Sequence, residues 1–453
     1  MKHRAGPDES DPIDLGRRTA LAGLMELGVS CMIPAVVTAL ESPKRASERS
    51  VSARAGEISR EDEAFLEEIE RACFRFFWEQ SSPRTGLVKD RSLAGGDDSR
   101  QVGSIAATGF GLTALSIADH RGFVSRSQAR DRALLTLKFL SDSFPHERGF
   151  FYHFIDIESG ARVWKCELSS IDTAILLCGV LTCAEHFRDA EIQRYAARIF
   201  DRVDWRWMLN GGGTLSQGWK PESGFLKSRW DTYSELMMLY LLGLGSSTYP
   251  LPDATWDAWR RPMFEYQGIR YIKGAAPLFV NQYSHAWFDF RGKRDRYADY
   301  FENSVAATRA HRLFCLSLHS KFPDYSEDLW GITASDSAHG YVAWGGPPPE
   351  GPIDGTVVPS APGGSLPFLP SDTLRVLRTI RSRYGDKAWK RYGFVDAFNP
   401  LSGWFDADAI GIDMGITLLM AENIRTGFVW QTFMRSTIAQ RGMARAGFRC
   451  IKS

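Results

Sequence analysis

The chain has few cysteines and histidines, and none of them is spaced as a metal ligand. Its 453 residues include 7 cysteines and 9 histidines, without a CxxC, HxxxH or HExxH arrangement. Structural zinc sites and zinc proteases depend on such spacings. We therefore expect no metal and no cofactor. Cys178 and Cys183 lie in an apolar segment, where free cysteine behaves as a small hydrophobic residue.

The chain also lacks an excess of charge of either sign. Its 55 basic and 54 acidic residues leave a net charge of +1. Nucleic-acid-binding domains and polybasic membrane-surface proteins carry a clear excess of positive charge. The balance therefore argues against both as the main activity, and neither nucleic acid nor a membrane surface is an expected partner.

Long uninterrupted apolar runs are also missing, and the apolar N-terminal stretch is typical of an export signal. Arg17 and Arg18 precede a stretch that ends near Val37-Thr38-Ala39, which fits a small-residue cleavage site. A twin arginine in this position is the bacterial Tat pattern. Glu26 and Pro34 interrupt the stretch, so a stable membrane span is not expected.

These features divide the N-terminal part of the chain into two segments. We expect residues 1–39 to be a Tat-type signal peptide, with a short buried helix as the alternative. The charged, serine-rich residues 40–60 are typical of a disordered linker. The residues before Cys31 match a lipobox poorly, so lipid anchoring is not expected. The mature protein is predicted to be periplasmic or secreted.

From residue 61 to 440 the sequence alternates helix-like segments with turn-rich loops. Apolar residues between Phe65 and Phe77 recur at spacings of three and four, which predicts an amphipathic helix. Further helices are predicted at 106–120, 125–144, 170–187, 189–203, 232–243, 256–266, 297–319, 371–384 and 413–427. The segments are not self-similar, which disfavours a solenoid. We predict an all-α domain of paired helices that close into an α/α toroid, with long aromatic loops and short hairpins at one mouth, and a C-terminal tail at 441–453.

Three short segments combine aromatic rings with carboxylates: Gly218–Glu235, Gln282–Phe290 and Trp330–Asp336. A pyranose offers C–H faces on which aromatic rings stack, and hydroxyls that bond to carboxylates and amides. The same rings also serve to build a large core, but the three segments together favour a carbohydrate site. The predicted substrate contacts are Glu167, Trp219, Trp230, Asp231, Tyr233, Gln282, His285, Trp287, Trp330, Asp336 and Tyr341.

Two carboxyl groups are candidates for the pair that glycoside hydrolysis needs. Glu235 directly precedes the apolar segment LMMLYLLGL, and Asp413 lies between Ile412 and Met414. Apolar surroundings of this kind raise a carboxyl pKa. Each also has a structural interpretation, because carboxylates are favoured at helix N-termini and as N-caps. Asp172, ahead of the apolar run TAILLCGVL, is a third candidate, either as a cap or as a group that contacts glycan or orients water.

At these residues the chain resembles a known family. The stretches that carry the resemblance are ELSSIDTAILL, VDWRWML, GWKPESGF, RWDTYSELMMLYLLGLGS, PLFVNQYSHAWFDFR, LWGITASD and GIDMGITLLMAENIRTGFVWQTFM. They resemble the bacterial glucoamylase-like family of (α/α)6 toroids, which is related to the endo-β-1,2-glucanases. Together they span essentially all of residues 60–435.

The resemblance implies an inverting glycoside hydrolase with a large central cavity. By position, Glu235 is the implied proton donor and Asp413 the base-side carboxylate. Asp172 lies where β-1,2-glucanase relatives have a functional glutamate. Ser169 stands where those relatives have an aspartate, and this difference disfavours β-1,2-glucan in particular.

We therefore predict an exported, monomeric glycoside hydrolase that acts on a β-glucan or a related oligosaccharide. Two alternatives stay open. A polysaccharide lyase on the same fold would use a base such as Tyr283, Tyr341 or His285, although no basic cluster accompanies them. A non-catalytic glycan-binding protein would keep the aromatic platform and tolerate loss of the carboxyl pair.

Overall fold

The computed structural model describes residues 58–347 and 350–451. The predicted signal peptide (1–39) and the predicted linker up to residue 57 lie outside the described residues. The predicted end of the linker at residue 60 coincides with the first residue of a helix, Arg60.

The described chain is mainly helical. Its longer helices are α2 (Arg60–Glu79), α3 (Ile105–Arg121), α4 (Arg126–Asp142), α5 (Ser170–Phe187), α6 (Ala190–Asp201), α8 (Met237–Gly245), α11 (Tyr300–Ser317), α13 (Pro370–Tyr384), α14 (Gly411–Arg425) and α16 (Thr437–Arg445). Shorter helices are α7 (Trp205–Leu209), α9 (Thr255–Ala258), η1 (Leu278–Asn281), α10 (Tyr283–Trp287), α12 (Ser360–Gly363), η2 (Gly385–Lys387) and α15 (Phe428–Phe433).

The strands are all short. They are β1 (Arg91–Leu93), β2 (Val102–Ser104), β3 (His146–Glu147), β4 (Phe150–Tyr152), β5 (Phe154–Asp156), β6 (Leu168–Ser169), β7 (Gly218–Lys220), β8 (Gly224–Phe225), β9 (Met263–Tyr266), β10 (Ile269–Ile272), β11 (Lys293–Arg294), β12 (Ala334–Ser335), β13 (Val342–Ala343), β14 (Trp389–Lys390), β15 (Gly393–Phe394), β16 (Phe398–Asn399), β17 (Trp404–Phe405), β18 (Asp408–Ile410) and β19 (Arg449–Cys450). The largest sheet is antiparallel, with the order β3-β4-β6-β7-β8.

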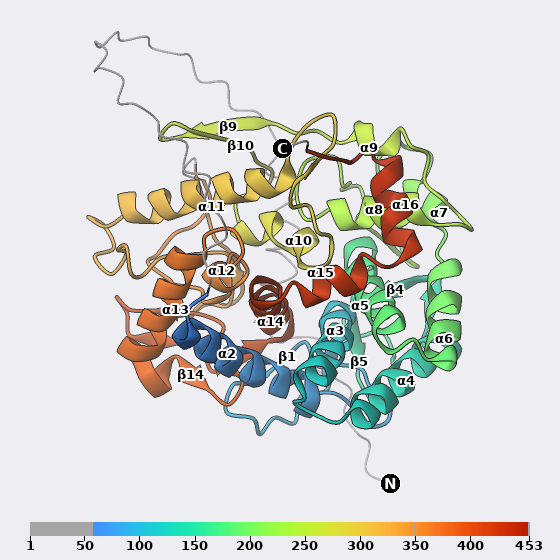
Figure 1. Ribbon diagram of the computed structural model, residues 1–453, viewed down its shortest axis with the longest axis horizontal. Helices are drawn as coiled ribbons and strands as arrows, with labels where there is room; N and C mark the ends of the chain where they lie inside the picture. The colour runs from blue at the N-terminus through green and yellow to red at the C-terminus, as the bar shows by residue number, and fades with distance from the viewer. Residues whose placement is uncertain (1–57, 348–349, 452–453) are drawn as a thin grey trace.

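The helices fall into two groups according to their burial. Helices α3, α5, α8 and α14 are buried around most of their circumference, as expected for helices that are apolar on all sides. Helices α2, α4, α6 and α13 bury one face. The buried helices pack on one another, with α3 against α5 and α14, and α5 against α8. Figure 1 shows α14 end-on near the middle of the molecule, with α4, α6, α11 and α13 towards the periphery.

Two glycines allow the backbones of α3 and α5 to touch. A Cβ atom on Gly109 would lie 2.5 Å from the carbonyl oxygen of Ile175, and one on Gly179 would lie 2.1 Å from that of Gly109. No side chain fits at either position without moving the helices apart. The spacing of α3 and α5 is therefore fixed by these two residues.

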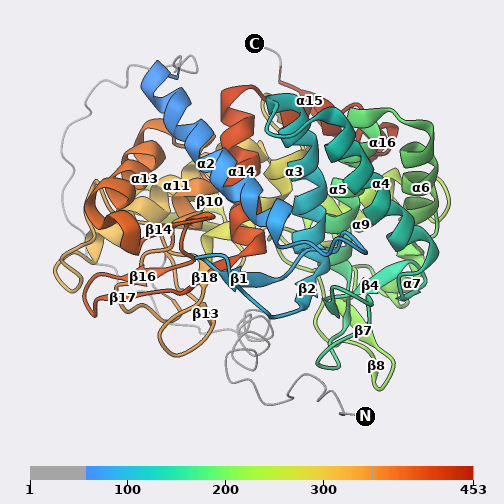
Figure 2. The same ribbon diagram turned by 90° about the horizontal axis from the view of Figure 1, so that it is seen from below.

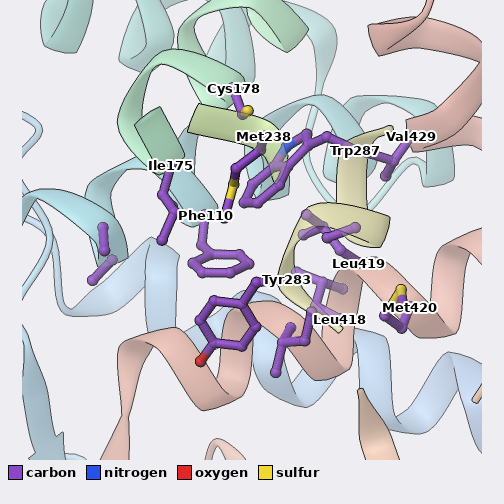
Figure 3. Packing of buried hydrophobic residues seen from close by; sticks show 14 of the residues in the cluster. Phe110, Ile175, Cys178, Met238, Tyr283, Trp287, Leu418, Leu419, Met420 and Val429 are labelled. Atoms are coloured by element: carbon purple, nitrogen blue, oxygen red, sulfur yellow. The ribbon is translucent and has the colours of Figure 1, made fainter. Parts of the chain in front are cut away.

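The packed interior is centred on Phe110 of α3 (Figure 3). Its ring centroid lies 4.9 Å from that of Trp287 and 5.7 Å from that of Tyr283, both on α10. A Cβ atom on Gly415 of α14 would lie 2.3 Å from this ring. Aromatic contacts and one glycine thus join α3, α10 and α14 directly.

The first described helix packs on a late one. Helix α2 contacts α14, and Arg425 at the end of α14 reaches the acidic face of α2. Its Nε lies 2.8 Å from Glu63 Oε2, and its guanidinium also contacts Glu67 and Glu70. This side chain is only 4% exposed, and a largely buried cation needs such carboxylate partners. The contact joins segments about 350 positions apart.

Most of the labelled strands lie at one end of the helices, at the bottom of Figure 2. Several of them run directly into buried helices: β2 into α3, β6 into α5 and β18 into α14. This end of the molecule therefore carries the N-termini of the buried helices.

Helix α5 is long and apolar enough to cross a membrane, but 72% of its 18-residue apolar window is buried in the protein. Length and composition alone do not assign it to a membrane.

The helix predicted at 170–187 coincides with α5. The helix predicted at 256–266 is wrong, because α9 ends at Ala258 and the chain, which passes Pro262, forms the hairpin β9–β10. The predicted boundary at residue 440 falls within α16, which packs on α8, and β19 then pairs with β11. The expected tail is thus part of the folded domain as far as Cys450.

We expect Gly179→Ala to destabilise the protein, because its methyl group would overlap the backbone of α3. Overpacking of this kind typically costs about 1–3 kcal/mol. Urea unfolding of the wild type and the variant measures the loss. The matched control is Gly95→Ala, where a Cβ atom meets nothing within 4 Å and a change within about 0.5 kcal/mol is expected. Equal stability of all three proteins would contradict the proposed contact.

Candidate active site

A cavity of about 290 Å³ lies among the N-termini of the buried helices. Four of its lining residues mark this position. Ser104 is the N-cap of α3, Asp172 and Asp413 are in the first turns of α5 and α14, and Glu235 lies in the turn before α8. The free N–H groups and the dipole of a helix N-terminus favour negative charge there. Three carboxyl groups from distant parts of the sequence therefore meet at one cavity.

Glu235 has the properties of a proton donor. Its side chain is buried, with 8% of the residue exposed. Burial raises its pKa to about 7, and the negative charge of Asp172 adds to the effect. The backbone carbonyl of Glu235 accepts a hydrogen bond of 2.6 Å from Ser284 Oγ, which fixes the turn that carries it. A carboxyl with this pKa is protonated in a substantial fraction of molecules at neutral pH.

A chain of polar groups occupies the wall beside Glu235. His153 Nδ1 lies 3.0 Å from Glu167 Oε1, and His153 Nε2 lies 3.5 Å from Asp172 Oδ2. Burial tends to raise the pKa of Glu167, but the hydrogen bond and the charge of His153 outweigh it and lower the pKa to about 2. Glu167 is therefore ionised over the whole physiological range. The cavity thus contains Glu235, whose pKa suits proton donation, and Glu167, which stays ionised.

Asp172 is held by the residue that caps its helix. Ser169 Oγ accepts a hydrogen bond of 3.2 Å from the Asp172 N–H and donates one of 2.5 Å to Asp172 Oδ2. The N-cap of α5 is thus Ser169, and not Asp172, so the side chain of Asp172 is directed by the cap and by His153. Sequence reasoning had left the cap and the functional interpretation of Asp172 open.

Asp413 lies on another element of the cavity, in the first turn of α14, and the residue is 3% exposed. Asp396 lies next to it. Burial raises the pKa of Asp396 well above its usual value, and the negative charge of Asp413 raises it further. Protonation of this coupled pair is therefore favoured at Asp396.

Asp396 also belongs to a group of carboxylates outside the cavity lining. Asp336, Asp396 and Asp406 each offer an oxygen, and these atoms lie within 4.8 Å of one another. The guanidinium of Arg91 contacts Asp336 and lies 3.3 Å from Asp90 Oδ2. Oxygen ligands of this kind suit Ca²⁺ or Mg²⁺. The expectation of no metal site did not foresee this group.

Six of the predicted site residues line the cavity. They are Glu235, Asp413, Asp172, Glu167, Trp230 and Tyr341. Trp230 is anchored by a hydrogen bond of 2.8 Å from its Nε1 to Ser170 Oγ in α5. Tyr341 packs with Ala334 and Ile410 in a small apolar cluster. The structure thus brings the three predicted catalytic carboxyls together with one predicted tryptophan and one tyrosine.

Five other predicted contacts are buried away from the cavity. The rings of Tyr233, Trp287 and Trp330 are fully enclosed in the core, which corrects their predicted stacking role, because no ring face is available to a sugar. Gln282 Nε2 donates to Ala361 O and Ser365 Oγ. His285 lies 3.0 Å from Ser304 Oγ, and burial lowers its pKa to about 3. Gln282 and His285 are therefore polar groups that form hydrogen bonds within the core.

Three more predicted contacts also lie outside the cavity lining. Trp219 in β7 packs against Trp207, with ring centroids 5.7 Å apart. Asp231 is exposed and lies 3.5 Å from Arg260. Asp336 contacts Arg91, as described above. None of the three lines the cavity, so the structure gives no support to their predicted sugar-contact role.

The sequence analysis missed several lining residues, namely Ser104, His153, Phe154, Trp164, Gln217, Lys220 and Ser228. His153 and Phe154 belong to the aromatic run GFFYHFID. Their rings stack on each other, 3.9 Å between centroids. The dense aromatic composition of this run was the signal that could have identified them.

Comparison with known proteins agrees with the fold. The family model described as "Putative glucoamylase" matches residues 227–437. A crystal structure with the same description, from Bacteroides uniformis, is 30% identical, covers 87% of this chain and 98% of its own, and has a TM-score of 0.80. The endo-beta-1,2-glucanase of Chitinophaga pinensis, in complex with sophorotriose and glucose, is 26% identical over 85% of this chain and 98% of its own, with a TM-score of 0.79.

These similarities define a glucoamylase-like fold, and the chain belongs to the family of that description. A curated relative is the exo beta-1,2-glucooligosaccharide sophorohydrolase (non-reducing end) of Parabacteroides distasonis. It is 27% identical over 448 residues, which cover 90% of this chain. The match spans 61% of the length of that relative.

We expect the stabilities of Glu235→Gln and Glu167→Gln to depend on pH in opposite ways. The pKa of Glu235 is raised, so the wild type loses stability as pH rises from about 4.5 to about 7. Glu235→Gln does not ionise and should therefore be more stable than the wild type above pH 7, by about 3 kcal/mol. Below pH 4 the two proteins should be equally stable. The lowered pKa of Glu167 gives stability that is present above about pH 4.5 and lost as pH falls towards 2.

Glu167→Gln should therefore be less stable than the wild type at pH 7, by about 3 kcal/mol, and the difference should vanish near pH 2. Unfolding free energies of the three proteins between pH 2 and pH 9 check both expectations. Parallel curves for the wild type and Glu235→Gln would show that Glu235 ionises normally in the folded protein.

Proposed function

We propose that this protein is a glycoside hydrolase that cleaves β-linked glucooligosaccharides, with β-1,2-linked chains as the first candidates. The observation that carries the proposal is the buried Glu235, whose pKa of about 7 suits a general acid, in a cavity shared with Asp172 and Asp413. The names of the similar proteins from Parabacteroides distasonis and Chitinophaga pinensis refer to β-1,2-linked glucose chains.

Ser169 does not weigh against a β-1,2-linked substrate once its contacts are considered. Its hydroxyl caps α5 and bonds to Asp172. Aspartate caps helices as well as serine does, so the exchange of one for the other preserves the cap of α5, although not the hydrogen bond that Ser169 donates to Asp172. The difference from the β-1,2-glucanase relatives then bears on the charge of the cavity and not on its architecture.

The mechanism that we propose is an inverting hydrolysis. Glu235 donates its proton to the glycosidic oxygen as the bond to the anomeric carbon breaks. Asp413 accepts a proton from the water that attacks the opposite face of the sugar, so the anomeric configuration inverts. Glu235 ends ionised and Asp413 ends protonated, and exchange with solvent restores both. Asp172, His153 and Glu167 bond to sugar hydroxyls and orient the water.

The alternatives have less support. A lyase must neutralise a uronate, and Lys220 and His153 are the basic side chains among the described lining residues, with His153 engaged by Glu167 and Asp172. A binding protein has no need of a buried carboxyl with a raised pKa, because such a group costs folding stability. The raised pKa of Glu235 therefore favours catalysis over binding alone.

We also propose the finer features of the fold and location. The buried helices α3, α5, α8, α10, α12 and α14 correspond to the inner ring of an (α/α)6 toroid, with α2, α4, α6, α11, α13 and α16 outside it. The twin-arginine sequence supports export by the Tat route to the periplasm or the medium, and we propose that the exported form is a monomer. The six cysteines in the described ranges are free, so folding before export requires no disulfide.

We expect Glu235→Gln to abolish turnover and to preserve binding. General acids contribute about 10²- to 10⁴-fold to the rate, so kcat should fall by about that factor, whereas the affinity for β-1,2-linked glucooligosaccharides measured by calorimetry should change little. The assay follows the anomer of the released product by NMR. Asp231→Asn is the matched control, because Asp231 is exposed outside the cavity. Wild-type kcat in Glu235→Gln would exclude Glu235 as the acid, and a retained anomer would exclude inversion.

The value of kcat/KM should also fall as pH rises above about 7. Glu235 must be protonated to act, and its pKa is about 7. Above that pH we expect kcat/KM to fall about tenfold per pH unit. A profile of kcat/KM from pH 4 to pH 9 measures this limb. Activity that stays constant from pH 6 to pH 9 would show that the proton comes from another group.

A further inference from the structure

One turn at the cavity has a backbone that its residues disfavour. Trp164 has φ = 53° and Lys165 has φ = 50°, and the N–H of Cys166 donates a hydrogen bond of 3.1 Å to the carbonyl of Val163. Positive φ at both central residues of a hydrogen-bonded four-residue turn is the mark of a type I′ turn. Such turns are dominated by Asn-Gly, Asp-Gly and Gly-Gly, because other side chains crowd the backbone at positive φ.

The rest of the described chain obeys this preference. The other pairs of consecutive positive-φ residues are Arg148-Gly149, Asn210-Gly211 and Gln267-Gly268, and each has glycine in second place. Gln267-Gly268 connects β9 and β10 in a turn of the same kind. Trp164-Lys165 is the pair without a glycine. Unfavourable backbone of this kind persists where the surroundings enforce it, and it concentrates at functional sites.

The surroundings of the turn explain how it is enforced. Val163 N–H donates to the carbonyl of Phe154, and the Cys166 thiol lies 3.3 Å from the backbone N–H and carbonyl of Phe154. Val163, Phe154 and Cys166 form a small buried cluster. Both ends of the turn are thus tied to β5, and the two residues between them have no freedom to relax.

The turn places Trp164 on the cavity wall. Trp164 lines the cavity and is half-buried, whereas Lys165 is exposed and does not line it. The indole packs edge-to-face on Phe154, with ring centroids 5.2 Å apart and an interplanar angle of 65°. Phe154 in turn stacks on His153, which bonds to Glu167. The indole of Trp164 therefore lies on the same cavity wall as Glu167, whose carboxylate can accept hydrogen bonds from sugar hydroxyls.

We propose that Trp164 is a stacking platform for one glucose ring of the substrate, and that the strained turn at 163–166 exists to present it. The inference rests on the proposed function and names a binding residue for it. A pyranose presents an apolar C–H face to an indole, while its equatorial hydroxyls reach carboxylates at the rim of the ring. Trp164 with Glu167 and His153 supplies both kinds of contact within one wall.

The proposal predicts opposite effects of substitution on stability and affinity. Trp164→Asn should keep or raise the melting temperature, because asparagine tolerates positive φ. The same change should weaken affinity for sophorotriose about tenfold, which is the effect expected for the loss of one aromatic contact. Affinity is measured by calorimetry in the Glu235→Gln background, so that the sugar is not cleaved. Trp164→Phe, which retains a smaller ring, should lie between the two.

Lys165→Gly is the matched control. It relieves the same turn and should raise the melting temperature by about 1–3 °C, with affinity unchanged because Lys165 does not line the cavity. A Trp164→Asn protein with wild-type affinity would overturn the inference, and so would one that melts several degrees lower, since the indole would then be a packing residue. A wild-type protein that neither binds nor cleaves any glucan would instead remove the proposed function itself.

Discussion

The direct contact between the backbones of α3 and α5 is the constraint on which the rest of the structure depends. Gly109 and Gly179 let the two helices approach until only backbone atoms separate them. The N-termini of both helices are then fixed relative to each other, and Ser104 and Asp172 with them. Helix α8 packs on α5 and α14 on α3, so the positions of Glu235 and Asp413 follow from the same contact.

The apolar packing that holds these helices also tunes the chemistry. Glu235 is buried, and its burial raises its pKa. Glu167 lies in the same cavity but has His153 beside it, and its pKa falls. Two carboxyl groups of one cavity thus take different protonation states, because Glu167 bonds to His153 whereas Glu235 is buried and faces the negative charge of Asp172. The raised pKa of Glu235 lowers the folding stability of the protein at neutral pH.

Much of the candidate site was predictable, and the reasons for the failures are physical. Glu235, Asp172 and Asp413 were identifiable because each is a charged group that interrupts an apolar segment, and all three line the cavity. Tryptophan carries no such signal, since one indole suits both core and sugar: Trp230 lines the cavity, whereas Trp287 and Trp330 are buried. Trp164 was missed because its position depends on a turn that its own sequence disfavours. Helix periodicity located α5, but it failed at 256–266, where Pro262 decides the conformation.

The contact between α2 and α14 has a consequence for biosynthesis. Helix α2 leaves the ribosome before the other described helices, and its partner Arg425 is about 350 residues further on. At about 5–20 residues per second, translation of that span takes on the order of tens of seconds. During this time α3 and α5, which are apolar on nearly all sides, have no complete set of neighbours. The nascent chain therefore exposes apolar surface of α3 and α5 until α14 and α15, which pack on them, have been synthesised.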